Sequence, residues 1–447
     1  MNILSITAGA ADMYCGSCLR DNALAAELLA RGHQVTLLPI YTPTVTDEPN
    51  VSTGRRVFFG GISVYLEQHF PLFRHTPWLM DRLWDAPGVI KQLAGRAVQV
   101  DPRLLGALTV STLQGEGGYQ RKEVEKLLHW LAGEPRPDVI NLPNAMLIAL
   151  ASSIRRALDR PVVVTLQGED LFLEGLPEPY KAQALSLVRS QVGNVDLFVS
   201  VSEYYTEFMA EYLRIPRGRI RTVPLGVNVN DLSPPRGGSR TAPAGGQDPF
   251  TIGYFARIAP EKGLHNLAEA YRILRQERGL PPSRLLAAGY LGGDQRAYLD
   301  GVHRALATCG LDEEFTYRGS VDRAGKVTFF HELDVLSVPS DYHEPKGLYL
   351  LEAMACSVPV VQPNHGAFPE MLRHTGGGVL ADSARPADIA DAILALWRDP
   401  AQRALLGQRG AHGVRAHYTV GHMADRTLEV YGDLLNTRPR DVEALQA

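Results

Sequence analysis

The chain has 447 residues, of which 45% are hydrophobic and 21% are charged, and its formal net charge is -4. This length and composition are typical of a globular protein with two domains or slightly more. Because basic and acidic residues are interspersed without a long basic run, we expect no nucleic-acid partner and at most peripheral contact with a membrane.

Targeting signals and cysteine content indicate the cellular compartment of the protein. The N-terminal stretch MNILSITAG lacks a charged n-region and a long apolar h-region, and no segment reaches about 18 uninterrupted apolar residues. The four cysteines are too few to hold a chain of this length together by disulfides, which suits a reducing compartment. These features predict a cytoplasmic location and give no indication of the oligomeric state.

Short apolar runs rich in β-branched residues alternate with longer helical patterns in the first half of the chain. The runs that we expect to form strands are 2–7, 34–39, 138–143, 161–166, 196–201 and 220–225. This alternation predicts a parallel sheet covered by helices on both faces, in an N-terminal domain of residues 1–232.

The helix after the first strand has an apolar and a polar face. The residues that we expect to face the sheet are Ala25, Leu28 and Leu29, and those expected to point away are Arg20, Glu27 and Arg31.

Residues 60–118 interrupt the alternation. Their hydrophobic side chains include Trp78, Leu79, Met80, Leu83 and Trp84. These side chains fit a lid over an acceptor, a helix that touches a membrane, or buried packing, and we favour buried packing.

The composition changes in the middle of the chain. Residues 233–249, SPPRGGSRTAPAGGQDP, contain four prolines and four glycines in seventeen positions, and they therefore predict a linker. A C-terminal domain of residues 250–418 follows. Its expected strands are 250–256, 284–289, 315–319, 334–340 and 358–363.

Residues 419–447 contain a helical pattern that we expect to pack back across the hinge. Two doubly wound domains joined in this way form a cleft between the carboxyl ends of their sheets, where open α/β proteins bind ligands.

The stretch GYFARIAPEKG places two cations between a strand and a helix. The strand ends near Ala256, Arg257 and Lys262 follow in the loop, and Gly263 precedes the helix. Two cations five residues apart at such a junction can hold a diphosphate, together with nearby backbone N–H groups. The alternative interpretation is a solvated loop with two ordinary surface charges.

A second stretch, EPKGLYLLE, carries two carboxylates. Glu344 lies just before a helix expected to begin near Gly347, and Glu352 lies eight residues later, about 12 Å along the helix axis. Gly347 permits close approach to the backbone, and the positive end of the helix suits a phosphate. The two carboxylates fit a sugar and a ribose that flank a diphosphate, although a capping acid and an exposed helix residue are the alternative.

Together these motifs resemble those of the family 4 glycosyltransferases of the GT-B fold. The nucleotide-sugar site of that family consists of a loop of the form R…EKG, two glutamates separated by seven residues, and a loop similar to GG.PE. This chain has RIAPEKG, EPKGLYLLE and HGAFPE, with RGHQV after the first helix and PLGVNVNDLSP at the end of the first domain. The resemblance covers nearly the whole chain and implies an α/β GT-B architecture of two Rossmann-like domains.

The resemblance also implies an activity. Members of the family are metal-independent, retaining hexosyltransferases that move a sugar from a nucleotide-diphosphate sugar to a hydroxyl of a glycan, a glycolipid or a small molecule. Arg257 and Lys262 would bind the diphosphate and stabilise the charge on the departing nucleotide, and Glu344 would hold hydroxyls of the donor sugar. These three residues are the expected catalytic residues.

The other expected donor-binding residues are Gly16, Val321, Lys346, Gly347, Leu348 and Glu352. By the resemblance, Glu352 would hold the ribose and Val321 would lie near the base. Lys346 departs from the bulky aromatic residue that the family often has at this position, and it would either add to the phosphate site or face solvent.

No His/Asp cluster with metal-ligand spacing stands out in the sequence, in agreement with the metal independence of the family. His343 adjoins Glu344, but a lone histidine in a loop is more often a hydrogen-bonding neighbour than a metal ligand. We expect no cofactor other than the nucleotide sugar, which is a co-substrate.

The stretch CGSC, with Cys15 and Cys18, opens the first helix. Counted back from RGHQV, Gly16 falls at the second glycine of the first-domain glycine loop of the family. We therefore interpret CGSC as a substrate loop whose thiols line the site or pack. The helix N-terminus would lower the thiol pKa values, so that a redox role stays open, whereas a zinc site would lack a second cysteine pair.

The stretch VVVTLQGEDLF places Gln167 where many relatives have a histidine. Glutamine can orient an acceptor hydroxyl but cannot take its proton at neutral pH. Either Glu169 or Asp170 assists, or the donor phosphate accepts the proton, and we favour the phosphate. Gln167, Glu169 and Asp170 are the expected acceptor-side residues.

Three other functions fit parts of the sequence. GISVYLEQHFPLF is similar to the first domain of glycogen and starch synthases, which implies an α-glucan acceptor, but the first loop lacks their Lys-x-Gly-Gly pattern. A nucleotide-sugar 2-epimerase and a non-catalytic sugar-nucleotide sensor are the alternatives from other functional classes. The sequence does not specify the nucleotide, the sugar or the acceptor.

Overall fold

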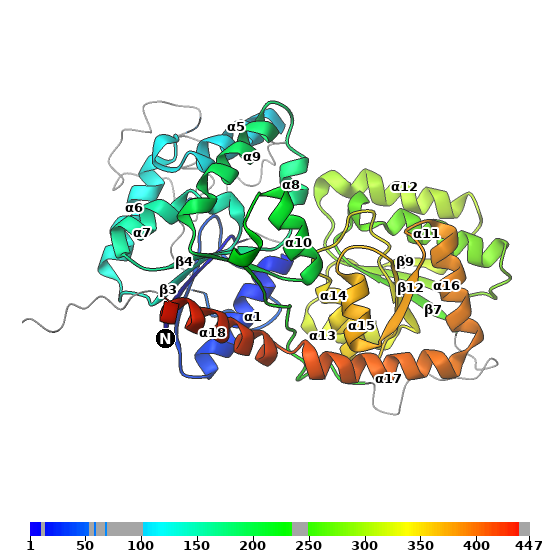
Figure 1. Ribbon diagram of the computed structural model, residues 1–447. Helices are drawn as coiled ribbons and strands as arrows, with labels where there is room; N and C mark the ends of the chain where they lie inside the picture. Colours follow the sequence, from blue (N-terminus) through cyan, green and yellow to red (C-terminus); the bar gives the residue numbers. More distant parts are fainter. Residues whose placement is uncertain (10–13, 53–57, 60–67, 69–101, 235–248, 438–447) are drawn as a thin grey trace, which may run out of the picture. The chain divides into compact units, whose positions relative to one another are not determined.

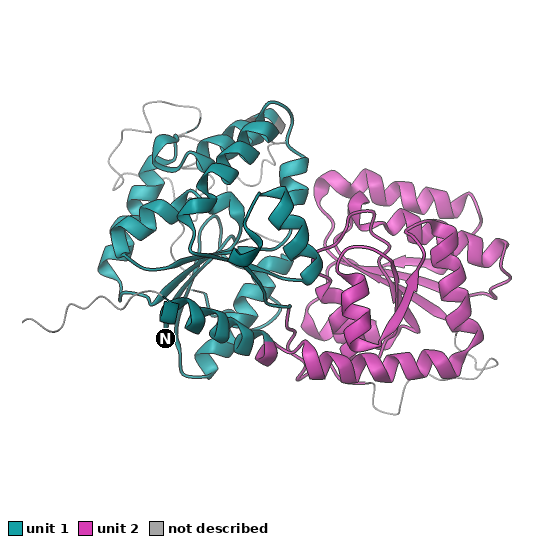
Figure 2. Cartoon of the chain, in the orientation of Figure 1, with its two compact units in different colours: residues 1–224, 423–447 teal, residues 225–422 magenta. Residues whose placement is uncertain are grey.

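The computed structural model describes residues 1–9, 14–52, 58–59, 68, 102–234 and 249–437 (Figure 1). The chain forms two compact units, of which the first comprises residues 1–224 and 423–447 and the second comprises residues 225–422 (Figure 2). Most of the segment 60–118, including its five hydrophobic candidates, and most of the expected linker 233–249 lie outside the described residues.

The first unit is built on a six-stranded parallel sheet in the order β2-β1-β3-β4-β5-β6. Its strands are β1 (Asn2–Thr7), β2 (Gln34–Pro39), β3 (Val139–Leu142), β4 (Val162–Leu166), β5 (Leu197–Ser200) and β6 (Ile220–Thr222). Every one of them lies within an expected run, because buried parallel strands are read as short apolar runs. The central strands β3, β4 and β5 are buried along their whole length.

Helices surround this sheet (Figure 1). They are α1 (Gly16–Ala30), α5 (Pro102–Leu113), α6 (Arg121–Gly133), α7 (Leu150–Leu158), α8 (Asp170–Glu174), α9 (Tyr180–Gln191), α10 (Glu203–Tyr212) and, from Met423 onward, α18 (Val420–Thr437). Within the described part of the chain, no helix is both long and apolar enough to cross a membrane.

Helix α1 buries a different set of residues from the one expected. Ala25 and Leu28 are buried as predicted, but Leu29 is 39% exposed and Arg20 is only 3% exposed. The prediction that Leu29 faces the sheet is therefore wrong, whereas Arg20, expected to point away from the sheet, is buried.

Side chains of the C-terminal helix α18, which passes near α1 (Figure 1), contribute to the burial of Arg20. Arg31 of α1 forms an ion pair with Asp425 of α18. Tyr431 of α18 is buried and is close enough to Arg20 and Asp21 for their charges to act on its pKa, which burial raises. An element more than 380 residues away in the sequence thus covers the polar face of α1.

The second unit has its own six-stranded parallel sheet, in the order β12-β11-β10-β7-β8-β9. Its strands are β7 (Thr251–Phe255), β8 (Arg284–Ala288), β9 (Phe315–Tyr317), β10 (Val335–Ser337), β11 (Val360–Pro363) and β12 (Gly378–Ala381). The first five lie within expected runs. The edge strand β12 was not expected, because its run GVLA is short and follows two other glycines.

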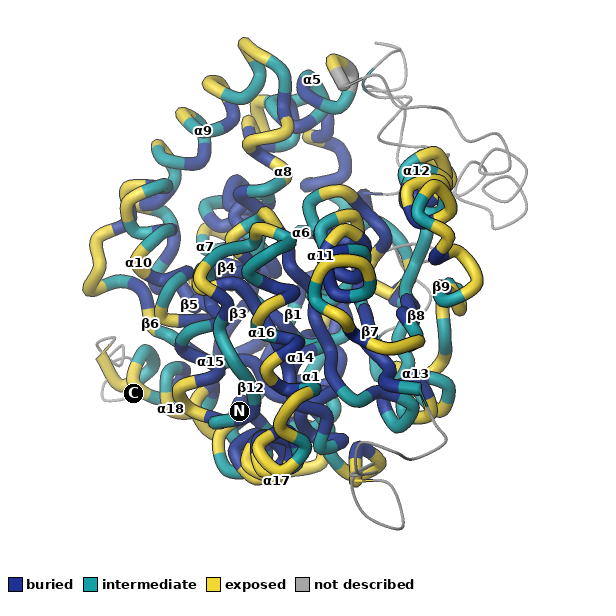
Figure 3. Tube along the Cα trace, turned by 90° about the vertical axis from the view of Figure 1, so that its right-hand side faces the viewer, coloured by how far each residue is buried: buried dark blue, intermediate teal, exposed yellow. Residues whose placement is uncertain are grey.

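Seven helices of the described residues pack around this sheet. In Figure 3 the strands are largely buried, and the exposed residues lie on the outer turns of the helices. The seven helices are α11 (Leu264–Gln276), α12 (Arg296–Ala307), α13 (Arg323–His331), α14 (Leu348–Ala355), α15 (Phe368–Thr375), α16 (Pro386–Arg398) and α17 (Pro400–His417). The predicted α/β architecture of two doubly wound parallel sheets is confirmed.

The strand order of the second unit determines where a ligand can bind. The chain runs outward from β7 through β8 to β9, and then returns to β10 on the other side of β7 before it continues to β11 and β12. In open parallel sheets, ligands bind outside the carboxyl ends of the strands at the point where the strand order reverses. The loops that follow β7 and β10 therefore border the expected binding position.

Candidate active site

The loop after β7 has a fixed backbone. The hydroxyl group of Tyr254 donates a hydrogen bond to the carbonyl oxygen of Arg257, at 3.1 Å. A single 3-10 turn (Pro260–Lys262) then leads to Gly263, whose φ of 72° lies in the left-handed region that favours glycine. A Cβ atom on Gly263 would lie 1.9 Å from the carbonyl oxygen of Pro339, so only glycine lets this loop approach the loop after β10.

This close approach leads to a stability prediction for Gly263→Ala. We expect a loss of about 2–4 kcal/mol in the free energy of unfolding, since a left-handed alanine costs roughly 1–2 kcal/mol and the overlap with Pro339 adds to that cost. Gly279→Ala is the matched control, because Gly279 has a φ of 73° but an added Cβ atom would meet nothing within 4 Å. Equal losses in the two variants, measured by urea denaturation, would contradict the proposed close packing.

Lys262 and Glu344 form an ion pair between the loops after β7 and β10. The side chains are 14% and 4% exposed, so the pair is largely removed from solvent. Lys262 also lies 5.8 Å from the centre of the Tyr342 ring, in a cation–π contact. The structure thus joins two sequence-predicted site residues that are 82 positions apart.

The electrostatic setting of Glu344 favours its ionised form. Burial alone would raise the pKa of the Glu344 carboxyl group, but the charges of Lys262 and Lys346 outweigh burial and hold that pKa below its ordinary value. A backbone hydrogen bond from Lys346 acts in the same direction. Glu344 is therefore a carboxylate that can accept hydrogen bonds.

Arg257, the second expected cation, is paired differently. It forms an ion pair with Glu261 within the same loop, and its side chain is 45% exposed. Exposed pairs of this kind contribute little to stability, so the guanidinium group can leave Glu261 at small cost. Arg257 and Lys262 therefore differ, because Arg257 is paired at the surface whereas Lys262 is held against the buried Glu344 carboxylate.

The loop HGAFPE lies against Glu344, as the backbone contacts show. The N–H group of Ala367 donates to the carbonyl oxygen of Glu344 at 2.9 Å. Gly366 has a φ of 62°, and a Cβ atom there would lie 2.7 Å from that same oxygen. The rings of His343 and His365 stack with their centres 4.4 Å apart. The structure thus brings the second and third sequence motifs together.

Helix α14 begins where the sequence predicted. Gly347 precedes its first residue, Leu348, with a φ of 116°, which is favourable for glycine. The backbone N–H groups of the first turn therefore follow directly on Glu344 and Lys346. Val321, the residue expected near the base, lies in the loop between β9 and α13.

Glu352 is held by two cations that the sequence analysis did not identify. Lys326 donates to the Glu352 carboxylate at 2.7 Å, and both side chains are at most 10% exposed. An Arg323 nitrogen lies 3.6 Å from the same oxygen, and Arg323 also binds both carboxylate oxygens of Asp231, at 2.6 and 2.8 Å. A buried glutamate requires a positive partner, and this requirement was the signal that could have indicated these residues.

Helix α13 explains how both cations reach Glu352. Asp322 caps the helix by accepting a hydrogen bond from the Gly325 N–H group at 2.8 Å. Arg323 and Lys326 follow three residues apart, a spacing that places them on one face of a helix. The stretch GSVDRAGK thus contains both Val321, which is expected near the nucleotide base, and the two cations that lie next to Glu352.

The expected acceptor-side residues lie in the first unit and are buried. One oxygen of Glu169 accepts from the Gln167 N–H group at 2.7 Å, and the other accepts from the Ala145 N–H group at 2.9 Å. Tyr205 donates to Asp170 at 2.6 Å. Burial raises the pKa of Glu169, partly offset by its backbone hydrogen bonds. These contacts give both carboxylates a role in fixing the loop after β4.

Gln167 differs from its two neighbours. Its side-chain nitrogen donates to the carbonyl oxygen of Pro143 at 2.7 Å, but its side-chain oxygen is buried without a hydrogen-bond partner among the described residues. The amide is therefore held in one orientation and keeps one free acceptor. Gly16, the remaining expected residue of this unit, is the first residue of α1.

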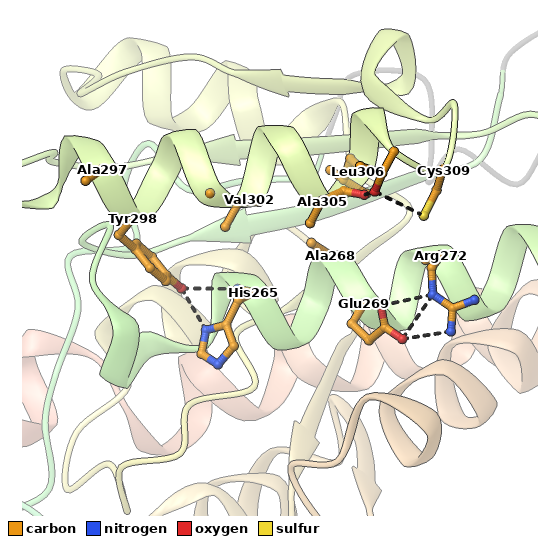
Figure 4. Close-up of a pocket in the computed structure, with 12 residues that line it drawn as sticks. His265, Ala268, Glu269, Arg272, Ala297, Tyr298, Val302, Ala305, Leu306 and Cys309 are labelled. Carbon is orange, nitrogen blue, oxygen red and sulfur yellow. Dashed lines mark hydrogen bonds and ion pairs between the residues drawn. The ribbon is translucent and has the colours of Figure 1, made fainter.

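A cavity of about 400 Å³ lies between α11 and α12 (Figure 4). Ala268, Val302 and Leu306 give it apolar walls, and His265 meets the hydroxyl group of Tyr298 at 2.9 Å at one end. Its lining includes none of the expected donor-binding residues. The cavity is therefore distinct from the Lys262–Glu344 pair.

Comparison with known proteins identifies the class of this fold and site. The family described as "Glycosyl transferases group 1" matches residues 240–412, and "Glycosyltransferase Family 4" matches residues 108–231. The two models match different parts of the chain, and the resemblance to the family 4 glycosyltransferases of the GT-B fold seen in the sequence is confirmed.

Two particular relatives illustrate the match. The D-inositol 3-phosphate glycosyltransferase of Pseudarthrobacter chlorophenolicus is 31% identical over 237 residues, which are 53% of this chain and 55% of that protein. D-inositol 3-phosphate glycosyltransferase 1 of Catenulispora acidiphila is 26% identical over 85% of this chain and 88% of its own. The match thus spans about half of the first relative and most of the second.

Among solved structures, Anabaena HepE in complex with UDP has a TM-score of 0.66 at 18% identity. The match covers 97% of this chain and all of that one. At this identity the comparison supports the fold, which it confirms as GT-B over nearly the whole chain.

Proposed function

We propose that this protein is a retaining, metal-independent glycosyltransferase that moves a hexose from a nucleoside-diphosphate sugar to a hydroxyl group of a carbohydrate or another acceptor. The observation that carries this proposal is the contact between Lys262 and Glu344 beside the strand-order reversal of the second sheet. A cation and an ionised carboxylate at that position suit a diphosphate linked to a sugar. The names of the relatives, and the UDP bound to HepE, support the same reaction class and donor.

Lys262 and Arg257 supply the positive charge in this proposal. Charge builds up on the diphosphate as its bond to the sugar breaks, and cations placed there beforehand stabilise the transition state more than the ground state. Glu344 accepts hydrogen bonds from sugar hydroxyls and Glu352 from the ribose. Lys326 fixes the Glu352 carboxylate in position for that contact.

The proton of the acceptor hydroxyl goes to the departing phosphate in this proposal. The buried contacts of Glu169 and Asp170 support this choice, because both carboxylates are already engaged by backbone N–H groups or by Tyr205. Gln167 keeps a free oxygen that can accept a hydrogen bond, but it cannot remove a proton at neutral pH.

A donor screen tests the function. UDP-glucose, GDP-glucose and ADP-glucose are compared by thermal shift, since a ligand at 100 times its dissociation constant stabilises the folded state by about 2.7 kcal/mol. The donor that binds is then incubated alone, with D-inositol 3-phosphate, and with an α-glucan. Consumption that requires an acceptor supports transfer, conversion of the donor alone indicates an epimerase, and binding without turnover indicates a sensor.

Metal removal and product stereochemistry test the finer claims. We expect the transfer rate to be unchanged by excess EDTA, because Lys262 and Arg257 supply the charge that a divalent metal provides in other transferases. Proton NMR of the first product should show the same anomeric configuration as the donor. A rate that falls with EDTA and returns with Mg²⁺, or an inverted product, would contradict the respective claim.

A further inference from the structure

Two thiols meet at the start of α1. Cys15 is the residue that precedes the helix and is half-buried, whereas Cys18 lies in the first turn and is fully buried. The Cys15 thiol is close enough to Cys18 to act on its pKa. Neither cysteine is in a disulfide in this structure.

The backbone allows these thiols to approach further. Cys15 has an extended backbone, with φ of -103° and ψ of 125°, and its side chain makes no capping hydrogen bond. Residues three apart within a helix have Cβ atoms roughly 5–6 Å apart, but Cys15 lies outside the helix and is not held at that separation. A disulfide needs a Cβ separation of about 3.5–4.5 Å, so a small rotation of the residue outside the helix is enough.

The two thiols differ in accessibility and in readiness to react. Cys15 is half-buried and directly precedes the helix, so an oxidant can reach it more readily than it can reach the buried Cys18. The neighbouring Cys15 thiol, together with burial, raises the pKa of the Cys18 thiol, so that Cys18 stays protonated while Cys15 is reduced. These differences suit Cys15 as the attacking thiol and Cys18 as the resolving thiol.

We propose that Cys15 and Cys18 form a reversible intramolecular disulfide, which makes the start of α1 a thiol–disulfide modification site. The Cys15 thiolate attacks a small disulfide such as oxidised glutathione, forms a mixed disulfide and releases one glutathione thiolate. The Cys18 sulfur loses its proton to solvent, attacks the Cys15 sulfur and releases the second glutathione. Two protein thiols are oxidised and one glutathione disulfide is reduced to two thiols.

The site has a structural consequence that does not depend on the proposed function. The disulfide ties the residue before α1 to the first turn of that helix, and the backbone between them contains Gly16. Oxidation therefore restrains the loop that the sequence assigns to the substrate. Reduction by thiols restores the arrangement seen here.

Equilibration with glutathione tests the proposal. The reduced full-length chain is incubated at rising ratios of oxidised to reduced glutathione, alkylated with iodoacetamide and digested for mass spectrometry. We expect a peptide with Cys15 linked to Cys18, two hydrogens lighter than its reduced form and restored by dithiothreitol. Cys309, which is half-buried and next to Thr308, serves as an internal control that can take up one glutathione.

Single variants separate the two roles. Cys18→Ala should stop at a Cys15–glutathione mixed disulfide, whereas Cys15→Ser should leave Cys18 reduced because it is buried. If the wild-type chain retains two alkylated thiols, or only a mixed disulfide on Cys15, at the most oxidising ratio, the proposal is overturned. Cys18→Ser is a second resolving-thiol variant in case the smaller alanine impairs folding.

Discussion

Lys262→Ala is expected to lower kcat/KM for a confirmed donor by on the order of 10–100-fold, because one charge-assisted hydrogen bond of roughly 1.5–3 kcal/mol to the departing diphosphate is lost. Most of the loss should appear in kcat, since that contact strengthens as the diphosphate gains charge. Arg257→Ala should have a similar effect on rate, and the double variant should be close to inactive while still folded.

The same substitution should also destabilise the protein. Lys262→Ala leaves Glu344 buried without its closest counter-ion, and breaking a buried ion pair in this way typically costs about 3–5 kcal/mol. Arg257→Ala should cost much less, because its pair with Glu261 is exposed. Urea denaturation of the two variants measures this difference directly.

The stability effect of Lys262 should depend on pH in a defined direction. Because the folded-state pKa of Glu344 is below its ordinary value, the pair contributes its full stabilisation above the unfolded pKa of about 4.3 and loses it as the pH falls through the folded pKa. Wild type and Lys262→Ala should therefore converge in stability at low pH.

Two controls separate the catalytic effect from the stability effect. The double variant Lys262→Met with Glu344→Gln removes both charges, so it should recover stability without recovering activity. Lys181→Ala removes a lysine from an exposed pair with Glu174 and should change neither quantity. If Lys262→Ala keeps both kcat and KM for a confirmed donor, the diphosphate site has been misplaced.

The strands of this fold could be predicted because parallel strands buried on both faces appear as short apolar runs, as VINL of β3 and VVVTL of β4 illustrate. The prediction of which side chains are buried was weaker, because contacts with distant parts of the chain decide the burial of some residues. Helical periodicity placed Arg20 on the polar face of α1, but the residue is buried, and Tyr431 of α18 lies close to it from the other end of the chain. Periodicity within one helix carries no information about a second layer of packing.

The candidate site could be predicted only in part, because the sequence shows residue types and spacings within a stretch but not the contacts between distant stretches. The types and spacings of Arg257, Lys262, Glu344 and Glu352 are local properties of two stretches of sequence. Their pairing is not local, because the Lys262–Glu344 contact depends on β7 and β10 being neighbours in the sheet. Lys326, the partner of Glu352, was missed because it lies on α13, which belongs to neither of the motifs GYFARIAPEKG and EPKGLYLLE.

Lys326→Met is expected to reduce stability by about 3–5 kcal/mol and to weaken donor binding, with a smaller effect on kcat. Methionine keeps most of the volume of the buried lysine side chain but leaves the Glu352 carboxylate with only Arg323, at 3.6 Å. A buried carboxylate that has lost its closest partner is less well positioned to accept hydrogen bonds from the ribose.

A double-mutant cycle with Glu352→Gln tests whether Lys326 acts through Glu352. The double variant should be more stable than Lys326→Met alone, because no unpaired buried charge remains, but its donor affinity should stay low. Additive effects on stability would show that the two side chains are not coupled. Arg275→Met, which removes a partly buried partner of Glu314 in the same unit, is the matched control and should lower stability without changing donor affinity, because Glu314 is not among the expected donor-binding residues.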